Sequence, residues 1–360
     1  MDKIFIIAGE ASGDLHGSHL VKALKRYQPS LQIQAYGGSK MEEEGATIVR
    51  DYQEFAFMGF YEVAKNASKV LRNLKETKKL IEDFKPDAII FIDFPSFNIR
   101  IAKHIKAQLP STKLYYYISP KVWAWKSGRV HILNKLMDEI FVIFPFEVDF
   151  YAKYGYDVTY VGNPLLDEIQ QIPDLEKKKD LIAVLPGSRR QEIQKMLPVF
   201  AELASYMPDF KFEVSVMPQF SIDFYHAHAG RLAPNLTFSK RSTYEMLNEA
   251  SLAVVTSGTA TLETALFNTP QVVAYKTSWL SYFIGKKVIK INYISLVNII
   301  LDKMAITELI QHELTVNHLK AELEEMIRNP EQILSDYAAL QKLLGKGGAS
   351  ENVARKILAG

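Results

Sequence analysis

Short apolar stretches alternate with helical patterns along the first half of the chain. Lys3–Ala8 is rich in isoleucine, and a helical pattern begins soon after it. Asp87–Asp93 (DAIIFID) is apolar between its two aspartates, which is typical of a strand buried on both faces of a sheet. Leu114–Ile118 and Ile140–Phe144 follow the same pattern. Strands that alternate with helices predict a parallel sheet with right-handed crossovers.

A segment with prolines and a charged run, Gly162–Asp180, separates this half from a second one. After it the alternation restarts, with strands predicted at Leu181–Leu185, Leu252–Thr256 and Gln271–Tyr275. The tail from His318 onward has a helical pattern. The simplest architecture for this α/β pattern is two doubly wound, Rossmann-like domains that face a cleft.

Composition narrows the class of protein further. The 360 residues are 48% hydrophobic and 23% charged, which supports two buried cores and excludes a disordered or disulfide-stapled chain. A net charge of +2 is too small to indicate nucleic-acid binding. The absence of cysteine excludes thiolate nucleophiles and Cys-ligated zinc. Since neither a signal peptide nor a stretch of about 20 apolar residues is visible, we expect a soluble cytoplasmic protein.

Ligands of an open parallel sheet bind outside the carboxyl ends of its strands, so polar residues there are the first candidates. In the first half these are Glu10 and Asp93. A partly desolvated Asp93 would have a raised pKa suited to a general base. The alternatives are that Asp93 caps the next helix, or that Glu10 is the base.

Two strand-to-helix junctions in the second half of the chain have residues that favour the binding of an anion. Gly187-Ser188-Arg189 could offer backbone N–H groups and a guanidinium to a phosphate, although a helix cap with a surface arginine explains it equally well. Ser257-Gly258-Thr259 repeats the arrangement, and Glu263 follows one turn later. Glu263 could accept hydrogen bonds from a ribose or simply face the helix dipole. Together the junctions predict a nucleotide diphosphate.

No metal or other cofactor is expected. The histidines His16, His19, His104 and His131 lack ligand spacing, and the chain has no Asp-x-Asp pair, the usual bridge between a metal and a diphosphate. Cations and helix ends would then neutralise the leaving group. A loop with Trp123 and Trp125 could contact a sugar, a phosphate or lipid, or its tryptophans could be buried to hold the loop.

Taken together, the motifs resemble those of the lipid-A-disaccharide synthase family, inverting glycosyltransferases of the GT-B fold. One departure is Asn163, where many members of the family have histidine. The matching motifs are GEASGD (9–14), FMGFYEV (57–63), IDFPSFN (92–98), SPKVWAW (119–125), PFE (145–147), VGNPLLD (161–167), LPGSRRQE (185–192), SGTATLE (257–263), YISLVN (293–298) and TELIQ (307–311).

The resemblance implies a reaction. A 2,3-diacylglucosamine is transferred from UDP to the 6-hydroxyl of 2,3-diacylglucosamine 1-phosphate, giving the β-1,6-linked lipid A disaccharide 1-phosphate and UDP. Asp93 matches the family's presumed base, with Glu10 second. The UDP site would comprise Gly187, Ser188, Arg189, Ser257, Gly258, Thr259, Glu263 and Asn298. The alternatives are another UDP-sugar enzyme of the same fold, such as a 2-epimerase, and a non-catalytic nucleotide- or lipid-binding protein.

The GT-B resemblance also implies a division of the chain. We expect residues 1–165 to form the acceptor domain and residues 175–336 the UDP-sugar domain. The last helix, at about residues 337–360, should return to the first domain. The sequence leaves the oligomeric state open.

Both implied substrates carry acyl chains that should remain in the bilayer. We therefore expect the enzyme to be peripheral on the cytoplasmic face of the inner membrane. The segment Phe57–Lys79 suits that surface, because a helix there would have one apolar face and one basic flank. The alternative is a helix packed on the first domain's sheet. The residues expected at the acceptor or membrane are Phe57, Phe60, Lys65, Lys69, Arg72, Trp123 and Trp125.

Overall fold

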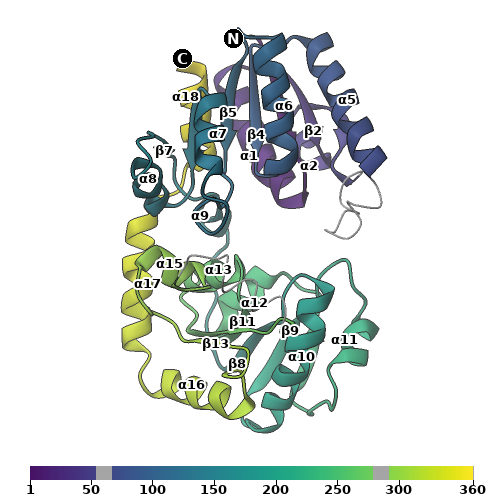
Figure 1. Cartoon of the computed structure of the whole chain (residues 1–360). Coiled ribbons are helices and arrows are strands. Elements are labelled where there is room, and N and C mark those ends of the chain that lie inside the picture. Colours follow the sequence, from purple (N-terminus) through teal and green to yellow (C-terminus); the bar gives the residue numbers. More distant parts are fainter. Residues whose placement is uncertain (54–66, 279–291, 360) are drawn as a thin grey trace. The chain divides into compact units, whose positions relative to one another are not determined.

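The computed structural model describes residues 1–53, 67–278 and 292–359, and these form two compact units (Figure 1). Unit 1 comprises Met1–Pro164 and Lys346–Gly360, and unit 2 comprises Leu165–Gly345. The chain therefore leaves unit 1 inside the proline-containing segment noted above. It returns to unit 1 only at Lys346, later than the Tyr337 start expected from the sequence.

The sheet of unit 1 is parallel throughout its described strands. Its order is β3-β2-β1-β4-β5-β6-β7, so β1 and β4 are neighbours and the strand order reverses between them. Such a reversal is where open α/β sheets bind ligands. The strands are β1 (Lys3–Ala8), β2 (Gln32–Gly37), β3 (Thr47–Asp51), β4 (Ala88–Ile92), β5 (Lys113–Tyr117), β6 (Glu139–Val142) and β7 (Thr159–Tyr160).

Helices cover both faces of this sheet. Ile4 and Ile6 of β1 pack in one core with α1 (Ala11–Tyr27), α2 (Ser39–Glu43) and α18 (Ala349–Ala359). Phe5 and Ile7 of the same strand pack in a second core on the opposite face. Burial on both faces explains why the strands are apolar without alternation. The helices of the second core are α5 (Ala67–Phe84), α6 (Pro95–Gln108), α7 (Arg129–Leu136) and α8 (Pro145–Ala152).

Unit 2 repeats the design with a second parallel sheet. Its order is β10-β9-β8-β11-β12-β13, which reverses between β8 and β11. The strands are β8 (Lys178–Leu185), β9 (Lys211–Ser215), β10 (Leu236–Ser239), β11 (Ala250–Thr256), β12 (Gln271–Tyr275) and β13 (Glu308–Ile310). The helices are α9 (Pro164–Ile169), α10 (Arg190–Ser205), α11 (Ile222–His228), α12 (Thr243–Glu249), α13 (Ala260–Leu266), α15 (Leu296–Leu301), α16 (Val316–Arg328) and α17 (Glu331–Leu344).

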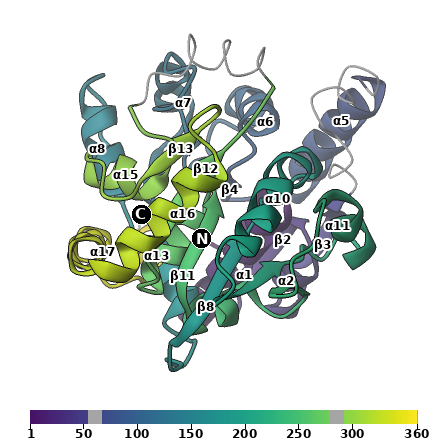
Figure 2. The ribbon, with the colours of Figure 1, turned by 90° about the horizontal axis from the view of Figure 1, so that it is seen from below.

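Helix α17 belongs to unit 2, which corrects the assignment of Tyr337 to the first domain. Figure 2 shows α17 and α11 at opposite sides of this unit. Tyr337 is fully buried, and its hydroxyl donates to the Thr269 carbonyl at 3.3 Å and accepts from the Gln271 amide at 3.2 Å. The sequence pattern predicted a helical tail, but which unit each helix joins depends on these distant contacts.

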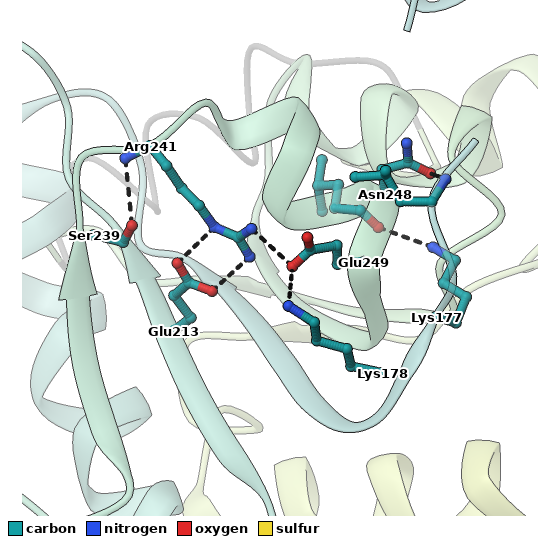
Figure 3. A network of polar contacts seen from close by, with 9 residues as sticks. Lys177, Lys178, Glu213, Ser239, Arg241, Asn248 and Glu249 are labelled. Carbon is teal, nitrogen blue, oxygen red and sulfur yellow. Dashed lines mark hydrogen bonds and ion pairs between the residues drawn. The ribbon is translucent and has the colours of Figure 1, made fainter. Parts of the chain in front are cut away.

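The charged run that follows the boundary is not a free linker, because its lysines form hydrogen bonds and ion pairs with other residues of unit 2 (Figure 3). The Lys177 ammonium donates to carbonyl oxygens at the C-terminal ends of α12 and α13, at 2.9 and 3.1 Å, and burial lowers the pKa of Lys177 to about 8. Lys178 pairs with Glu249 at 2.6 Å. Arg241 bridges Glu249 to Glu213 through three contacts of 2.7 to 2.8 Å. These bonds attach the entry of β8 to its own unit.

No helix among the described residues is long and apolar enough to cross a bilayer.

Candidate active site

Asp93 and Glu10 follow the neighbouring strands β4 and β1, at the reversal of the first sheet. Ala8 pairs with Ile92 at the ends of these strands, so the two carboxyl groups lie at one edge. Burial raises the pKa of Asp93 to about 6, the Glu10 charge adds to the rise, and the charge of Lys121 opposes it. A carboxyl group with this pKa is ionised near neutrality and basic enough to accept a proton.

The backbone at Asp93 is held in a strained conformation. Asp93 and Phe94 both have left-handed backbones, with φ of 43° and 48°, a conformation that costs non-glycine residues of order 1–3 kcal/mol each. The Asn98 amide donates to the Asp93 carbonyl at 2.7 Å, and the Tyr116 hydroxyl donates to the same oxygen. Phe94 is the N-cap residue of α6. Asp93 therefore does not cap this helix, as the alternative interpretation required.

The GEASGD motif supports this turn without supplying the base. A Cβ atom at Gly9 would lie 2.4 Å from the ring of Phe94, so glycine is needed for that ring to pack there. Asp14 is buried and accepts hydrogen bonds from the backbone N–H groups of Gly38, Lys40 and Met41 at 2.8 to 3.3 Å. Asp14, a residue of α1, therefore fixes the backbone at the start of α2. The residues next to Asp14 in the sequence did not indicate this structural role.

Glu147 joins two motifs that lie apart in the sequence. Its fully buried carboxyl group accepts from the Trp123 indole at 3.2 Å and from the backbone N–H groups of Ile143 and Phe144 at 3.2 and 3.0 Å. Burial raises the pKa of Glu147 to about 7. Trp123 also packs edge-on against Phe146 at 5.1 Å. Sequence reasoning missed Glu147, although the PFE motif contained it.

The two tryptophans of the loop therefore differ. Trp123 is partly buried and bonded to Glu147, which fits the alternative that it holds the loop, whereas the Trp125 residue is 39% exposed. The Lys126 ammonium lies 4.3 Å from the centre of the Trp125 ring. Asn163, the position that differs from the family motif, is buried and donates to the Ile143 carbonyl at 3.3 Å. It therefore supports the backbone that also bonds to Glu147.

In unit 2, the loop at residues 187–189 was expected to bind a phosphate, but a glutamate of the following helix already occupies part of its hydrogen-bonding capacity. The Glu192 carboxylate accepts from the Ser188 and Arg189 N–H groups at 3.1 and 3.2 Å and pairs with the Arg189 guanidinium at 3.3 Å. In this arrangement these two N–H groups are already bonded. The Arg189 side chain is 83% exposed, so its guanidinium remains accessible to an anion. Gly187 has a φ of 106°, which the turn requires.

Glu263 lies one turn into α13, beyond the exposed Gly258 and Thr259. Burial raises the pKa of Glu263 to about 7, with a second contribution from Glu168 and an opposing hydrogen bond with the Thr259 side chain. Glu168 accepts from the Tyr244 hydroxyl at 3.1 Å. Glu168 was not predicted, because α9 and α13 are far apart in the sequence.

Ser257 and Asn298 bond to the protein itself. The Ser257 hydroxyl donates to the Ile294 carbonyl at 2.8 Å. Asn298 is fully buried, its amide donates to the Ile306 carbonyl and the Glu308 carboxylate, and its oxygen accepts two backbone N–H groups. Since both ends of its side chain are bonded, Asn298 holds the loop before β13. A ligand would reach it only by displacing these bonds.

The comparisons with known proteins cover the same two units. The family described as lipid-A-disaccharide synthetase matches residues 4–359. The chain is 35% identical over 372 residues to the lipid-A-disaccharide synthase of Geobacter metallireducens, covering 99% of this chain and 96% of the relative. It is 36% identical over 376 residues to that of Syntrophus aciditrophicus, covering 98% and 96%. The chain belongs to the lipid-A-disaccharide synthase family.

Solved structures show the fold. A calicheamicin glycosyltransferase matches with a TM-score of 0.68 at 13% identity, over 100% of this chain and 98% of the other. A UDP-GlcNAc 2-epimerase from Neisseria meningitidis, bound to UDP-GlcNAc, matches with a TM-score of 0.68 at 12% identity, over 99% and 100%. The predicted GT-B fold is therefore confirmed. As a lipid-A-disaccharide synthase, the protein is a glycosyltransferase of lipid A biosynthesis.

In this lipid-A-disaccharide synthase, the predicted residues gather at the reversals of both sheets. Glu10 and Asp93 follow β1 and β4, whereas the loops at residues 187–189 and 257–259 follow β8 and β11. Each unit thus presents one group of candidate residues at the edge where its sheet can bind a ligand. Within the described ranges, no three His, Asp or Glu side chains are grouped closely enough to hold a metal ion.

Proposed function

We propose that the protein transfers 2,3-diacylglucosamine from UDP to the 6-hydroxyl of 2,3-diacylglucosamine 1-phosphate, with Asp93 as the general base. The observation that carries this proposal is the carboxyl group of Asp93 at the reversal of the first sheet, with a pKa of about 6. Asp93 removes the proton of the 6-hydroxyl group while the oxygen of that hydroxyl group attacks the anomeric carbon of the donor. The bond from that carbon to UDP breaks, and UDP leaves with the electron pair.

Unit 2 is the proposed UDP site. The exposed Arg189 guanidinium would face the diphosphate, where a charge-assisted fork stabilises the departing anion. Glu263 would accept from the ribose hydroxyls. Ser257–Thr259 would support the loop, and Glu192 would hold Arg189 in place. Because cationic side chains can carry out this neutralisation, we propose that no metal takes part.

We also propose that unit 1 meets the lipid surface on the cytoplasmic face of the inner membrane. Phe57, Phe60 and Lys65 lie outside the described residues, and the side chain of Lys69 does too. In the part of α5 that is described, Leu74 and Ile81 are buried in the core, whereas Leu71 is 63% exposed. Arg72 lies 4.0 Å from Glu76. The burial of Leu74 supports the packing alternative for the end of the segment Phe57–Lys79, and the membrane proposal concerns the beginning of that segment.

Phe57→Ser combined with Phe60→Ser should weaken binding to vesicles that contain anionic lipid, because it removes apolar surface that would enter the interface. The affinity for UDP should not change. Sedimentation of the enzyme with vesicles measures the first quantity and calorimetry the second. Unchanged vesicle binding, or a large fall in the thermal unfolding midpoint, would support a core helix instead.

Incubating the purified protein with both acylated sugars and searching for the disaccharide by mass spectrometry tests the reaction. UDP should be released only when both sugars are present. Release with the donor alone would indicate a different UDP-sugar enzyme, and binding without turnover would indicate a non-catalytic protein.

A further inference from the structure

Lys121 lies beside the proposed base on a fixed piece of backbone. It follows β5, which lies beside β4 in the sheet (Figure 1). Tyr117 at the end of β5 pairs with Ile92 at the end of β4. The neighbours of Lys121 in the loop, Ser119, Pro120 and Val122, are buried. The Ser119 hydroxyl is 2.8 Å from that of Tyr151. The position of Lys121 next to the strand edge is therefore set by the fold.

The side chain of Lys121 is exposed, unlike the residues that hold its backbone. Within the described part of the chain no carboxylate forms an ion pair with it. Its charge is nevertheless close enough to lower the pKa of both Asp93 and Glu147. Lys121 is thus an accessible cation at the edge where Asp93 and Glu10 place two carboxyl groups.

The acceptor makes such a cation useful. In a glucosamine ring, the carbon that carries the 1-phosphate and the carbon that carries the 6-hydroxyl arm are both bonded to the ring oxygen. A hydroxyl group that reaches Asp93 therefore brings the phosphate to the same neighbourhood. Without a cation, the phosphate would meet the charges of Asp93 and Glu10, and like charges repel.

We propose that Lys121 binds the 1-phosphate of the acceptor and thereby helps to select a phosphorylated sugar. This inference rests on the proposed function, because it takes the acceptor from that reaction. Lys121 could bind a phosphate oxygen from either substrate, because the acceptor carries a 1-phosphate and the donor carries a diphosphate. The position of Lys121 beside the base favours the acceptor.

The test compares Lys121→Gln with the wild-type enzyme on two acceptors, the 1-phosphate and its 1-O-methyl counterpart. With the 1-phosphate, the KM of the acceptor should rise about tenfold to a hundredfold, since a hydrogen bond to a charged group is lost. The preference for the 1-phosphate over the 1-O-methyl sugar should fall by a similar factor. Lys121→Arg should restore most of it, because the charge is kept.

Lys135→Gln is the matched control. Lys135 is also exposed, but it lies in the last turn of α7, which leads to the opposite edge of the sheet. It should leave the KM of both acceptors unchanged. The thermal unfolding midpoints of all variants should agree within about 2 °C, because a surface substitution changes stability little.

Three outcomes would overturn the inference. The first is an equal loss with both acceptors, accompanied by a shift of the pH profile, which would show that Lys121 acts on the base. The second is a loss of UDP affinity with an unchanged preference between acceptors, which would assign Lys121 to the donor. The third is no change at all. If the wild-type enzyme itself made no disaccharide, the proposed function would fail, and this result is distinct from the other three.

Discussion

At the scale of single residues, Asp93 combines a basic carboxyl group with a strained backbone. Burial and the charge of Glu10 both favour the protonated form of its carboxyl group, while Lys121 favours the ionised form. Two side chains bond to its carbonyl oxygen and keep the left-handed turn in place. The carboxyl group is thus directed by the turn and tuned by its neighbours, which is the usual way in which a protein prepares a base.

Asp93→Asn should lower turnover by at least about a hundredfold, because a general base typically contributes ~10²–10⁴ in rate. UDP affinity should hardly change. In the wild-type enzyme, kcat/KM should fall as the pH drops through about 6, where Asp93 becomes protonated. Glu10→Gln should move this fall to lower pH, since it removes a charge that raises the pKa. Glu43→Gln, on the exposed side of α2, is the control. A hundredfold loss in Glu10→Gln without one in Asp93→Asn would reverse the assignment.

Arg189→Ala should weaken UDP binding and turnover by about tenfold or more, because a charge-assisted contact to the diphosphate is removed. Calorimetry with UDP and initial rates measure the two effects. Arg231→Ala, another exposed arginine of unit 2, should change neither. Activity should also persist in a strong chelator. Activity that is lost there and returns with magnesium would contradict the proposal that no metal takes part.

At the scale of elements, the loops that follow the strands are held by carboxylate side chains. Glu147 fastens the tryptophan loop to the start of α8, and Asp14 fastens the start of α2. Glu192 does the same for the loop before α10. In each case a carboxylate accepts hydrogen bonds from backbone N–H groups of the loop and so fixes its conformation. The loops can then present exposed residues such as Lys121 and Trp125.

Glu147→Gln should lower the free energy of unfolding by about 1–3 kcal/mol, because the glutamine NH₂ group places two N–H donors against donors of the protein, whereas the carboxyl group carries at most one proton. The difference from wild type should be larger at pH 5 than at pH 8. Folding raises the pKa of Glu147 from 4.5 to about 7, so the stability it contributes is present at low pH and is lost as the pH rises through about 7.

Denaturant titrations at the two pH values measure this difference. Asp149→Asn, on the exposed side of the same helix, should show no such dependence. A difference that grows with pH would mean that the carboxylate of Glu147 is stabilised in its ionised form.

At the scale of the whole molecule, the chain crosses between the units twice, and the second crossing sends α18 back to unit 1. Val353, Ala354 and Ile357 of that helix join the core beside β1 and α1. The Asn352 amide also donates to the Val161 carbonyl at 2.9 Å. The end of the chain therefore stabilises the unit that carries Asp93.

Ile357→Ala should destabilise unit 1 by about 2–5 kcal/mol, the usual cost of such a cavity. Amide hydrogen exchange in β1 should become faster, whereas UDP affinity should be retained because the proposed UDP residues lie in unit 2. Leu343→Ala, at a residue of α17 that is 48% exposed, is the control and should cost little. Equal protection of β1 in both variants would show that α18 does not stabilise this core.

Much of this protein is determined by the sequence alone. Strands buried on both faces must be apolar throughout, so β1, β4 and β8 could be placed from their residues, and the parallel GT-B fold with them. The strand ends and the helices after them then indicated Asp93, Arg189 and Glu263 as candidate site residues, because an open parallel sheet binds ligands at one edge. The family motifs in turn indicated the activity that the relatives confirm.

Only the tertiary structure decided how these residues are held. Glu147 meets Trp123, Glu168 meets Tyr244, and Tyr337 remains in unit 2 through contacts between segments far apart in the sequence. No local pattern encodes such pairs, because hydrophobic periodicity reports only the faces of one element. The same reason explains Asn298, whose motif suggested a ligand contact but whose donors and acceptor are bonded to the protein. Burial and neighbouring charges, which set the pKa of Asp93, exist only once the chain has folded.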